Sequence, residues 1–383
     1  MSWWSNFDLA EVEADFARIA ACGLDSVRVF LTWEDFQPAA GRVDREMLAR
    51  LVLVADLAAG LGLKLIPTLF TGHMSGVNWI PSWALGGSDG DPRFRVVSGG
   101  RIVHTGLRNW YTDSAVLDAQ VLLATEAAAA LAGHEAVWAW DLGNENSNCV
   151  RPPTRTSARA WLAHLAAAIR GADATARVTV GLHMEDLEED RQLGPWEASE
   201  ACDLLSMHGY PIYARWADGP TDHQLLPFLA RVTHWLGDGR DLVFSEFGLP
   251  SLLVEEDAAA AYTARALEAL RRAGCLGALL WCYSDYDLAL WESPPFDLAP
   301  HERSFGLWRL DGSPKPAVAA IAAFVGAERC TPGHADGWID IDRDEFLLDP
   351  GVQLPRLYRR YGEQTRDEDS GSLAPPLRSS REE

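Results

Sequence analysis

Short apolar runs alternate with longer amphipathic segments along most of the chain. Seven runs are rich in β-branched and aromatic residues and predict strands at 25–33, 64–72, 137–145, 177–184, 204–213, 242–250 and 277–286. The intervening segments repeat apolar residues at helical spacing and predict helices at 9–22, 44–61, 114–132, 156–172, 221–236, 255–273 and 316–325. Strands that are apolar on both faces and alternate with helices predict a parallel sheet covered by helices.

A (β/α)8 barrel, or TIM barrel, accounts for this alternation but needs one strand more than the pattern supplies. The missing strand would precede the helix at 9–22. Either residues 1–7 form a degenerate first strand, or that strand is absent, which we favour. An open doubly wound sheet would carry a glycine-rich phosphate loop after its first strand, and the sequence after 25–33 has none. We therefore predict an α/β fold, a (β/α)8 barrel with its first strand absent or degenerate.

Two regions depart from the alternation. Residues 73–113 form a long connection rich in tryptophan, glycine and proline after the strand at 64–72. Such connections are commonly functional, and this one lies at the strand ends, where barrel enzymes place their sites. The other region is the C-terminus. We predict a barrel over 1–327, an extension over 328–363 that docks on the barrel, and a polar, charged and disordered tail over 364–383.

The chain is strongly acidic, with a net charge of −22 at pH 7. This charge argues against nucleic acid as a partner, because phosphate backbones bind basic patches, and it also argues against anionic membranes. No apolar run approaches the roughly 18 residues of a membrane span, and residues 1–6 lack a signal-peptide pattern. We therefore expect no membrane association and a cytoplasmic protein as written, or a secreted one if the true N-terminus lies upstream. The six cysteines are scattered, so we expect free thiols.

Two of the apolar runs end abruptly in a glutamate. Glu145 closes the stretch DLGNE at 141–145, and Glu246 lies in VFSEFG at 243–248. The carboxyl ends of the strands of a parallel barrel share one face, so both carboxylates are expected to project into one bowl. Cleavage of a glycosidic bond needs such a pair, because one carboxylate attacks the anomeric carbon and the other group protonates the leaving oxygen. The plain alternative is that each glutamate forms a salt bridge at its strand end.

Polar and aromatic residues of other strands supply the rest of such a site. Arg28 lies inside an apolar run, and a buried arginine is costly unless it pairs with a carboxylate. We expect Glu246 as its partner, which would keep that group ionised, or else another buried acid. His208 and Tyr210 lie on the same side of their strand, so the tyrosine could orient Glu246 and the histidine could bond the other glutamate. Trp281 lies in the last strand, where its ring could stack on the apolar face of a sugar.

Four further residues are predicted to contact substrate. They are Asn144, which precedes Glu145, and His73, Asn78 and Trp79 in the long connection. A metal-dependent hydrolase would instead place a His-x-His pair on an early strand and further His or Asp residues at later strand ends. The histidines of this chain do not line up in that way, so we expect neither a metal nor another cofactor.

The residues that carry a family resemblance follow one another in order: Arg28, Asn144 with Glu145, residues 208–210 (HGY), residues 245–248 (SEFG) and Trp281. With them the chain resembles glycoside hydrolase family 5 and its relatives in clan A, which include β-mannanases and cellulases. The resemblance implies an eight-stranded barrel and retention of configuration. It also implies an acid/base role for Glu145 on the fourth strand and a nucleophile role for Glu246 on the seventh, counting 25–33 as the second. Residues 70–79 resemble a mannanase-like branch.

We therefore expect a retaining glycoside hydrolase of polysaccharide degradation, which cleaves β-linked sugars of the mannan or glucan type by a two-glutamate double displacement. An endo-β-mannanase or a cellulase-like enzyme fits the resemblance. The two carboxyl groups are then expected to lie about 5–5.5 Å apart, whereas about 6.5 Å or more would indicate an inverting reaction. The alternative is a carbohydrate-binding barrel without catalysis. In both cases the partner is a carbohydrate.

Overall fold

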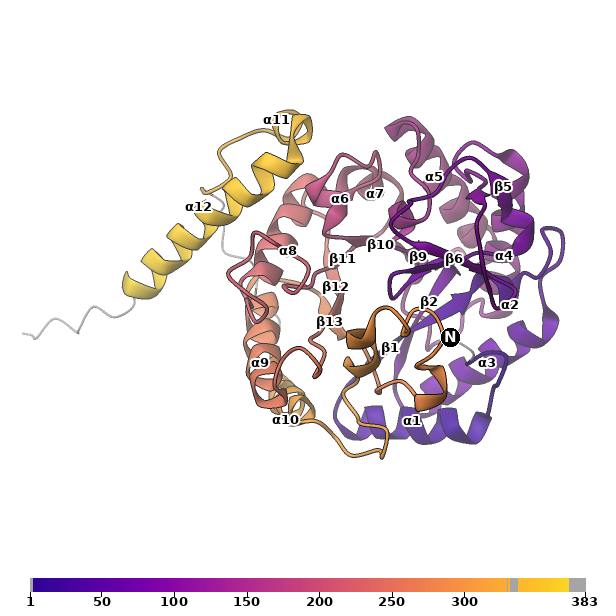
Figure 1. The fold of residues 1–383 in the computed structure, drawn as a ribbon, viewed down its shortest axis with the longest axis horizontal. Coiled ribbons are helices and arrows are strands. Elements are labelled where there is room, and N and C mark those ends of the chain that lie inside the picture. The colour runs from indigo at the N-terminus through magenta and orange to yellow at the C-terminus, as the bar shows by residue number, and fades with distance from the viewer. Residues whose placement is uncertain (1–2, 329, 331–336, 372–383) are drawn as a thin grey trace, which may run out of the picture.

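Seven parallel strands form one curved sheet at the centre of the protein, in the same order as in the chain (Figure 1). The computed structural model describes residues 3–328, 330 and 337–371, with side chains described as far as residue 365. The strands of the sheet are β1 (Ser26–Thr32), β2 (Lys64–Thr71), β9 (Trp140–Asn144), β10 (Val178–His183), β11 (Leu205–His208), β12 (Leu242–Phe247) and β13 (Gly277–Leu280). Each lies within one of the seven predicted runs, so the predicted parallel α/β architecture is confirmed.

The sheet curls into a barrel that stays open between its first and last strands. Within the described residues no strand precedes α1 (Leu9–Ala21), and residues 3–6 form a turn, as expected for an absent first strand. A cavity of about 420 Å³ opens between β1 and β13 and extends to Arg28 and Glu246. Across this opening the ring of Phe30 stacks on Trp281, with 5.5 Å between the centroids. This stack bridges the two ends of the sheet beside the predicted site.

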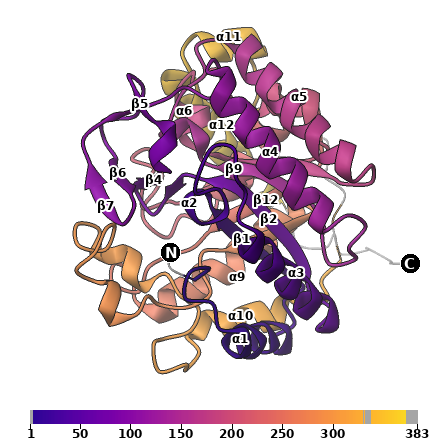
Figure 2. The same ribbon diagram turned by 90° about the vertical axis from the view of Figure 1, so that its right-hand side faces the viewer.

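Helices cover the outer face of the sheet (Figures 1 and 2). Besides α1 they are α3 (Arg45–Gly60), α4 (Ser114–Ala130), α5 (Arg155–Ala172), α7 (Pro195–Ala201), α8 (Leu225–Leu236), α9 (Glu256–Arg272) and α10 (Pro316–Phe324). Asp8, Asp44 and Asp113 begin three of them by accepting hydrogen bonds from backbone N–H groups of the first turn. Burial of the apolar helix faces against the sheet is the main force that holds the barrel together. None of the described helices is long and apolar enough to cross a membrane.

The connection at 73–113 builds two small sheets at the carboxyl end of the barrel. One contains β3 (His73–Met74), β4 (Val77–Trp79), β6 (Arg95–Ser98) and β7 (Arg101–Val103), and the other pairs β5 (Leu85–Gly87) with β8 (Gly106–Leu107). Figure 2 shows these strands projecting from one side of the barrel. Two short helices, α2 (Trp33–Phe36) and α6 (Glu185–Glu188), also follow strand ends on this face. The long connection is therefore regular structure at the face where the strand ends converge.

The C-terminal segment packs against the outside of the barrel through aromatic rings. It contains α11 (Arg343–Leu348) and α12 (Pro350–Gly371), drawn in yellow in Figure 1. Phe228 of α8 contacts the rings of Trp338, Tyr358 and Tyr361, with centroid distances of 5.4, 4.9 and 5.7 Å. Large aromatic side chains bury much apolar area in such contacts, which supports the predicted docking of this extension.

The last helix extends past the point where we predicted the tail to begin. We placed the start of a disordered tail at residue 364, but α12 continues to Gly371. Residues 364–370 contain neither proline nor glycine, so this stretch itself holds no residue that would end the helix before Gly371. The rest of the tail, 372–383, lies outside the described residues, and its predicted disorder is untested.

Candidate active site

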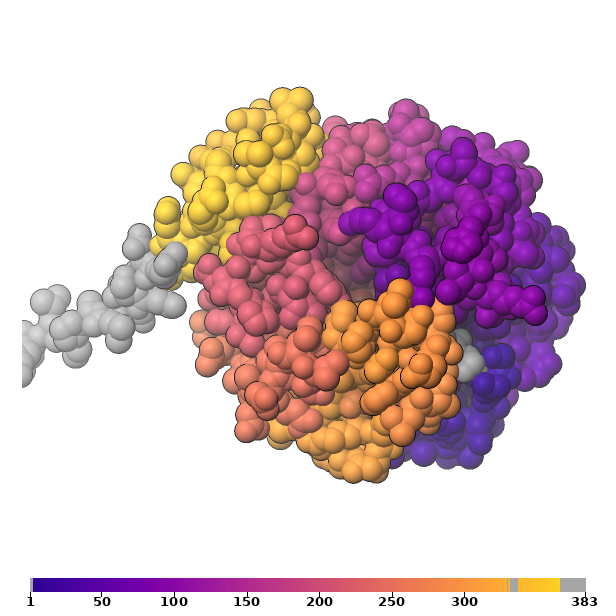
Figure 3. Space-filling model, viewed as in Figure 1, coloured from indigo at the N-terminus to yellow at the C-terminus, as the bar shows by residue number. Residues whose placement is uncertain are grey.

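The carboxyl ends of the strands surround a pocket of about 900 Å³ (Figure 3). Glu145 directly follows β9 and Glu246 lies in β12, and both line this pocket. A carboxylate oxygen of Glu145 lies within 4.8 Å of a carboxylate oxygen of Glu246. Glu145 has a left-handed backbone conformation, with φ of 49°, and strained residues of this kind cluster at functional sites. The convergence expected from the strand ends is therefore present.

Two donors hold the carboxylate of Glu246. The Arg28 guanidinium donates to Oε1 at 2.6 Å, and the Tyr210 hydroxyl donates to Oε2 at 2.8 Å. All three side chains are buried, and only 5% of the Arg28 side chain is exposed. Where water is largely excluded, a guanidinium and a hydroxyl donor strongly stabilise negative charge on a carboxylate. The contacts that we expected of Arg28 and Tyr210 are thus both observed.

Arg28 also serves a second carboxylate. Its Nε and Nη2 donate to Oδ2 of Asp141 at 2.9 and 2.6 Å, and Nη2 donates to Oδ1 of Asn144 at 2.8 Å. The sequence left open whether Arg28 pairs with Glu246 or with another buried acid, and the structure shows both. Arg28 does not belong to the pocket lining. It orients the groups around it, and its predicted contact with substrate has no support in this geometry.

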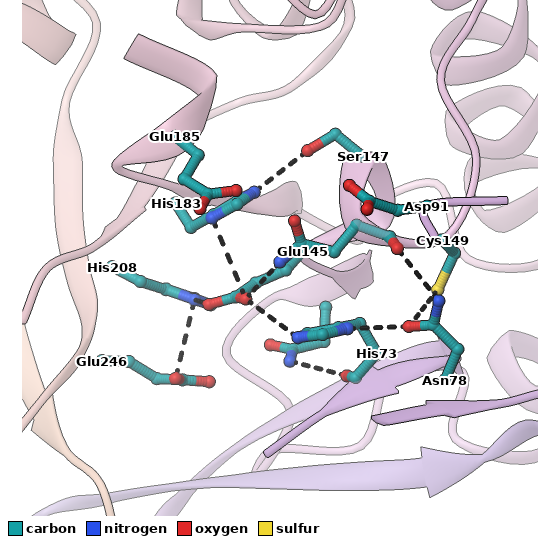
Figure 4. A network of polar contacts seen from close by, with 12 residues as sticks. His73, Asn78, Asp91, Glu145, Ser147, Cys149, His183, Glu185, His208 and Glu246 are labelled. Atoms are coloured by element: carbon teal, nitrogen blue, oxygen red, sulfur yellow. Dashed lines mark hydrogen bonds and ion pairs between the residues drawn. The ribbon is translucent and has the colours of Figure 1, made fainter. Parts of the chain in front are cut away.

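Glu145 lies among neutral donors and three histidines (Figure 4). Nδ1 of His208 lies 2.9 Å from Oε1, as we expected, and the amide of Asn148 donates to Oε2 at 3.1 Å. Nε2 of His73 and Nδ1 of His183 lie farther from Oε2, at 3.7 and 3.9 Å. Among the ion pairs of the described residues, those of Glu145 involve only histidines. Glu145 therefore differs from Glu246, whose carboxylate is held by Arg28.

The surroundings of Glu145 favour its protonated form. Burial raises the pKa of this carboxyl, and the nearby charge of Glu185 raises it further. Burial also lowers the pKa of His208 to about 4 and moves the pKa values of His73 and His183 below their ordinary value. The three imidazoles are therefore uncharged near neutral pH. Of the three, His73 is the one whose charge, when it is protonated, lowers the pKa of Glu145.

Asn78 fixes the proton of His73. The Asn78 amide nitrogen donates to the carbonyl oxygen of Asn148 at 2.9 Å, which turns its Oδ1 toward Nδ1 of His73 at 2.7 Å. An amide oxygen only accepts, so Nδ1 carries the proton and Nε2 presents a lone pair toward Glu145. Asn78 and Trp79 lie outside the pocket lining. Their predicted direct contact with substrate therefore has no support, since Asn78 pairs with His73 across the β3–β4 hairpin and stands behind it.

Five other residues that the sequence singled out do line the pocket: His73, Asn144, His208, Tyr210 and Trp281. Asn144 is held on both sides, because its amide nitrogen donates to the carbonyl oxygen of His73 at 2.9 Å while its Oδ1 accepts from Arg28. Trp281 directly follows β13, with its ring against Phe30. Its predicted role of stacking on a sugar stays a prediction.

Several polar residues of the pocket escaped prediction from the sequence: Asn148, His183, Glu185, Tyr213 and Glu302. His183 ends β10, so the strand-end rule that selected His208 would also select it. Asn148 belongs to the 3₁₀ helix Asn146–Asn148 that directly follows Glu145. Glu302 lies in a loop beyond the last strand, and no periodic pattern marks its approach to the pocket.

Arg191 sets the orientation of Asn148. Its side chain is fully buried, and Nη1 donates to Oδ1 of Asn148 at 2.8 Å and to the hydroxyl oxygen of Ser147 at 3.1 Å. The amide oxygen of Asn148 is thereby occupied, which leaves its nitrogen to donate to Glu145. Arg191 also pairs with Glu185 on the pocket wall. The buried charge of Arg191 thus orients the neutral amide of Asn148, and this amide is the group that bonds Glu145.

Two bidentate ion pairs anchor the long connection at the pocket mouth. Arg93 donates to both carboxylate oxygens of Glu185, in α6, at 2.9 and 2.8 Å. Arg95 donates to both oxygens of Asp297, in the loop after β13, at 2.7 and 2.6 Å. Paired N–H···O contacts of this kind fix geometry as well as charge. The segment 93–95 therefore joins two loops where the purple and orange segments meet in Figure 3, and its residues Arg93 and Phe94 line the pocket.

Glu145, His208 and Glu246 could also present one ligand atom each to a metal ion, since these atoms lie within 4.8 Å of one another. The guanidinium of Arg28, 2.6 Å from Glu246, already places a positive charge there. Like charges at such a distance repel strongly in a buried site. The arrangement therefore favours nucleophilic and acid–base chemistry by the side chains themselves.

Solved structures share this fold. A GH5_18 protein from Streptomyces cattleya in complex with GlcNAc has a TM-score of 0.81 and 23% identity, over 96% of this chain and 88% of that chain. A GH5_18 protein from Bifidobacterium longum subsp. infantis has a TM-score of 0.78 and 21% identity, over 96% of this chain and 86% of that chain. An exo-β-1,4-mannosidase from Opitutaceae bacterium strain TAV5 has a TM-score of 0.71 and 25% identity, over 86% of this chain and 57% of that chain.

No protein-family model and no curated protein matches this chain. The likeness to solved structures therefore rests on three-dimensional similarity over almost the whole chain. Because the neighbours with TM-scores of 0.81 and 0.78 carry the designation of glycoside hydrolase family 5, the predicted resemblance to that family is confirmed in the fold.

Proposed function

We propose that this chain is a retaining glycoside hydrolase, with Glu246 as the nucleophile and Glu145 as the acid/base. The proposal rests chiefly on the pair of glutamates, whose oxygens lie within 4.8 Å while only one carboxylate is paired with Arg28. An approach this close between two oxygens favours the roughly 5–5.5 Å carboxyl separation of retaining enzymes over the roughly 6.5–9.5 Å that inverting enzymes need to admit a water.

The reaction takes place in two displacements. In the first, a carboxylate oxygen of Glu246 attacks the anomeric carbon while Glu145 gives its proton to the glycosidic oxygen. The bond between that carbon and that oxygen breaks, an alcohol leaves, and the sugar remains as an ester of Glu246. In the second, water attacks the anomeric carbon, its proton passes to the Glu145 carboxylate, and the ester bond breaks. Two inversions at one carbon restore the original configuration.

The surrounding residues assist both steps. Arg28 and Tyr210 hold the Glu246 carboxylate and aim it at the anomeric carbon. His208 bonds Glu145 and keeps its carboxyl beside the leaving oxygen. Trp281 supports the sugar by stacking, as aromatic rings do on the apolar faces of ligands.

We further propose a β-linked mannoside as the substrate and release of single sugars from a chain end. Structural neighbours include an exo-β-1,4-mannosidase and a GH5_18 protein in complex with Manβ1-4GlcNAc. The segment held by Arg93 and Arg95 forms one wall of the pocket, and in this proposal the wall blocks one end of the site, whereas an enzyme that cuts within a polysaccharide needs an open groove. This wall favours exo action over the endo-β-mannanase or cellulase-like action expected from the sequence.

The substitution Glu246→Ala tests the proposed chemistry. It should abolish hydrolysis of 4-nitrophenyl β-mannoside, and azide should partly restore turnover with an α-mannosyl azide as product, because azide replaces the lost nucleophile. Glu255→Ala, at an exposed position on the outside of the barrel, is the matched control and should keep wild-type turnover. Near wild-type turnover by Glu246→Ala would remove the nucleophile from this position.

A substrate panel tests the proposed specificity. We expect mannose as the first product from Manβ1-4GlcNAc and from mannan oligomers, with little action on cellulose derivatives. Products of mixed length from mannan would show endo action instead. Binding of mannan oligomers without release of reducing ends, over long incubation, would favour the non-catalytic carbohydrate-binding barrel.

A further inference from the structure

A third buried carboxyl lies in the pocket beside the two glutamates. Glu302 belongs to the 3₁₀ helix Pro300–Ser304, in the loop between β13 and α10, and only 7% of the residue is exposed. It lines the same pocket as Glu145 and Glu246. The two-step reaction described above needs no third acid, so this residue requires its own explanation.

Neutral groups hold Glu302. The hydroxyl of Tyr213 donates to its Oε1 at 2.9 Å and also lies 2.8 Å from Nε2 of His301. Because the Tyr213 hydroxyl uses its hydrogen in the bond to Glu302, its oxygen can only accept from His301, and the imidazole N–H is the donor. In the described part of the chain, the ion pairs of Glu302 comprise His301 alone, at 3.5 Å. Buried structural carboxylates usually pair with an arginine or a lysine. Glu302 is instead held by Tyr213 and His301.

Glu302 lies on the side of the pocket that belongs to Glu246. The ring of Tyr213 packs edge-on against Tyr210, with 5.8 Å between centroids, and Tyr210 donates to Glu246. Phe305, three residues after Glu302, packs against the same Tyr210 ring at 5.7 Å. The nucleophile attacks the anomeric carbon of the sugar that is transferred, so groups on this side face that sugar and not the leaving group.

The loop that carries Glu302 forms part of one wall of the pocket. Asp297, which anchors Arg95 of the long connection, belongs to the same loop as Glu302. The residues between them approach the mouth, and Ala299 and His301 line the pocket together with Glu302. Where such a wall blocks one end of a glycosidase site, a polar residue in it meets the end of the substrate chain, at which a terminal sugar presents free hydroxyl groups.

We propose that Glu302 binds hydroxyl groups of the terminal, non-reducing sugar and so restricts the pocket to chain ends. This inference rests on the proposed glycosidase function and names a specificity residue within it. A carboxyl group can accept hydrogen bonds from two neighbouring hydroxyls, and a site built to bond a hydroxyl discriminates well against a sugar that lacks it. Burial, with the charges of Glu246 and Glu145, raises the pKa of Glu302 to about 7, which limits its repulsion of the nucleophile near neutral pH.

The plain alternative is that Glu302 only anchors Tyr213 and His301. The two readings differ in how the residue couples to the substrate. A hydroxyl-binding group loses its effect when the hydroxyl is removed, whereas a structural anchor affects all substrates alike. Comparison of a protein variant with substrates that lack single hydroxyls separates them.

The test measures kcat/KM of wild type, Glu302→Gln and Glu302→Ala on 4-nitrophenyl β-mannoside and on analogues that each lack one ring hydroxyl. Loss of a bond to a charged group should lower kcat/KM of both variants on the parent substrate by roughly tenfold to a hundredfold. On one of the deoxy analogues the variants should differ from wild type much less. Glu268→Gln, on α9 and paired with Arg271 outside the barrel, is the matched control and should behave as wild type.

Three results would overturn the assignment. One is unchanged kcat/KM of both Glu302 variants on the parent substrate. Another is an equal fall on the parent and on every deoxy analogue, with a lowered melting temperature, which marks a structural anchor. The third, no hydrolysis by wild type of any aryl glycoside, contradicts the proposed function itself, and this baseline keeps the two failures distinguishable.

Discussion

Glu246 and Glu145 are identical side chains in two different electrostatic settings, with oxygens within 4.8 Å of each other. Glu246 is clamped by a buried arginine and a tyrosine hydroxyl. Glu145 instead meets an asparagine amide and three uncharged imidazoles, and burial raises its pKa. Pairs of titratable groups whose environments differ in this way divide acid and nucleophile roles between them. The contrast shows that the surroundings, and not the residue type, assign the chemistry.

Variants of the two glutamates should differ most in how their activity depends on the leaving group of the substrate. Glu145→Ala should lower kcat/KM on Manβ1-4GlcNAc by about 10²–10⁴-fold, the usual contribution of general acid catalysis, because a sugar leaving group must be protonated. On 2,4-dinitrophenyl β-mannoside the first step needs no proton and should be nearly unaffected. Glu246→Ala should fail on both substrates. Equal losses by Glu145→Ala on both would show that it is not the acid.

The clamp on Glu246 should also contribute to folding. Arg28→Met leaves the carboxylates of Glu246 and Asp141 buried without their cation, which should lower the free energy of unfolding by about 3–5 kcal/mol. Arg45→Met removes an arginine whose side chain is 78% exposed and should cost less than about 1 kcal/mol. Urea unfolding of both variants measures the difference. Equal effects would mean that Arg28 contributes no more than a surface charge.

The Tyr210 hydroxyl, which donates to Oε2 of Glu246, should affect the reaction rate more than the stability of the fold. Tyr210→Phe removes one hydrogen bond to a charged group, so kcat/KM should fall by roughly tenfold to a hundredfold. Tyr283→Phe removes a hydroxyl that bonds Asp15 on the outside of the barrel and should leave kcat/KM unchanged. If the two variants behave alike, the bond to Glu246 has no catalytic weight.

The smallest effect concerns the proton of Glu145. The acid form exists below its pKa, so kcat/KM on a poor leaving group should fall as pH rises through that value. Asn78→Ala frees His73 to carry its proton on Nε2, where it faces the Glu145 carboxylate and stabilises the charged form. The pKa of Glu145 should then decrease, and the alkaline limb of the pH profile should move to lower pH. A limb that stays in place or moves to higher pH would contradict this tautomer assignment.

Residues at strand ends were predictable from the sequence because the topology of a parallel barrel fixes where they meet. This rule placed Glu145, Glu246 and His208 in one pocket, and the same rule, applied fully, would have added His183. It could not decide whether Arg28 pairs with one acid or two, because that depends on side-chain reach across three strands.

Loop residues were not predictable in this way. Glu302 reaches the pocket only because its loop is anchored to the long connection by the pair of Arg95 and Asp297, which lie far apart in sequence. Asn78 and Trp79 were expected to touch substrate, but the hairpin that presents His73 leaves them outside the pocket. Contacts of this kind depend on tertiary packing that no local pattern records.

Trapping the covalent intermediate tests the division of roles most directly. A 2-deoxy-2-fluoro-β-mannosyl fluoride carries a good leaving group and forms a slowly hydrolysed ester with the nucleophile of a retaining enzyme. After proteolysis, mass spectrometry should place one fluorosugar on the carboxyl of Glu246, and Glu145 should be unmodified. A sugar on Glu145, or turnover of natural substrate with inverted product and no adduct, would contradict the assignment.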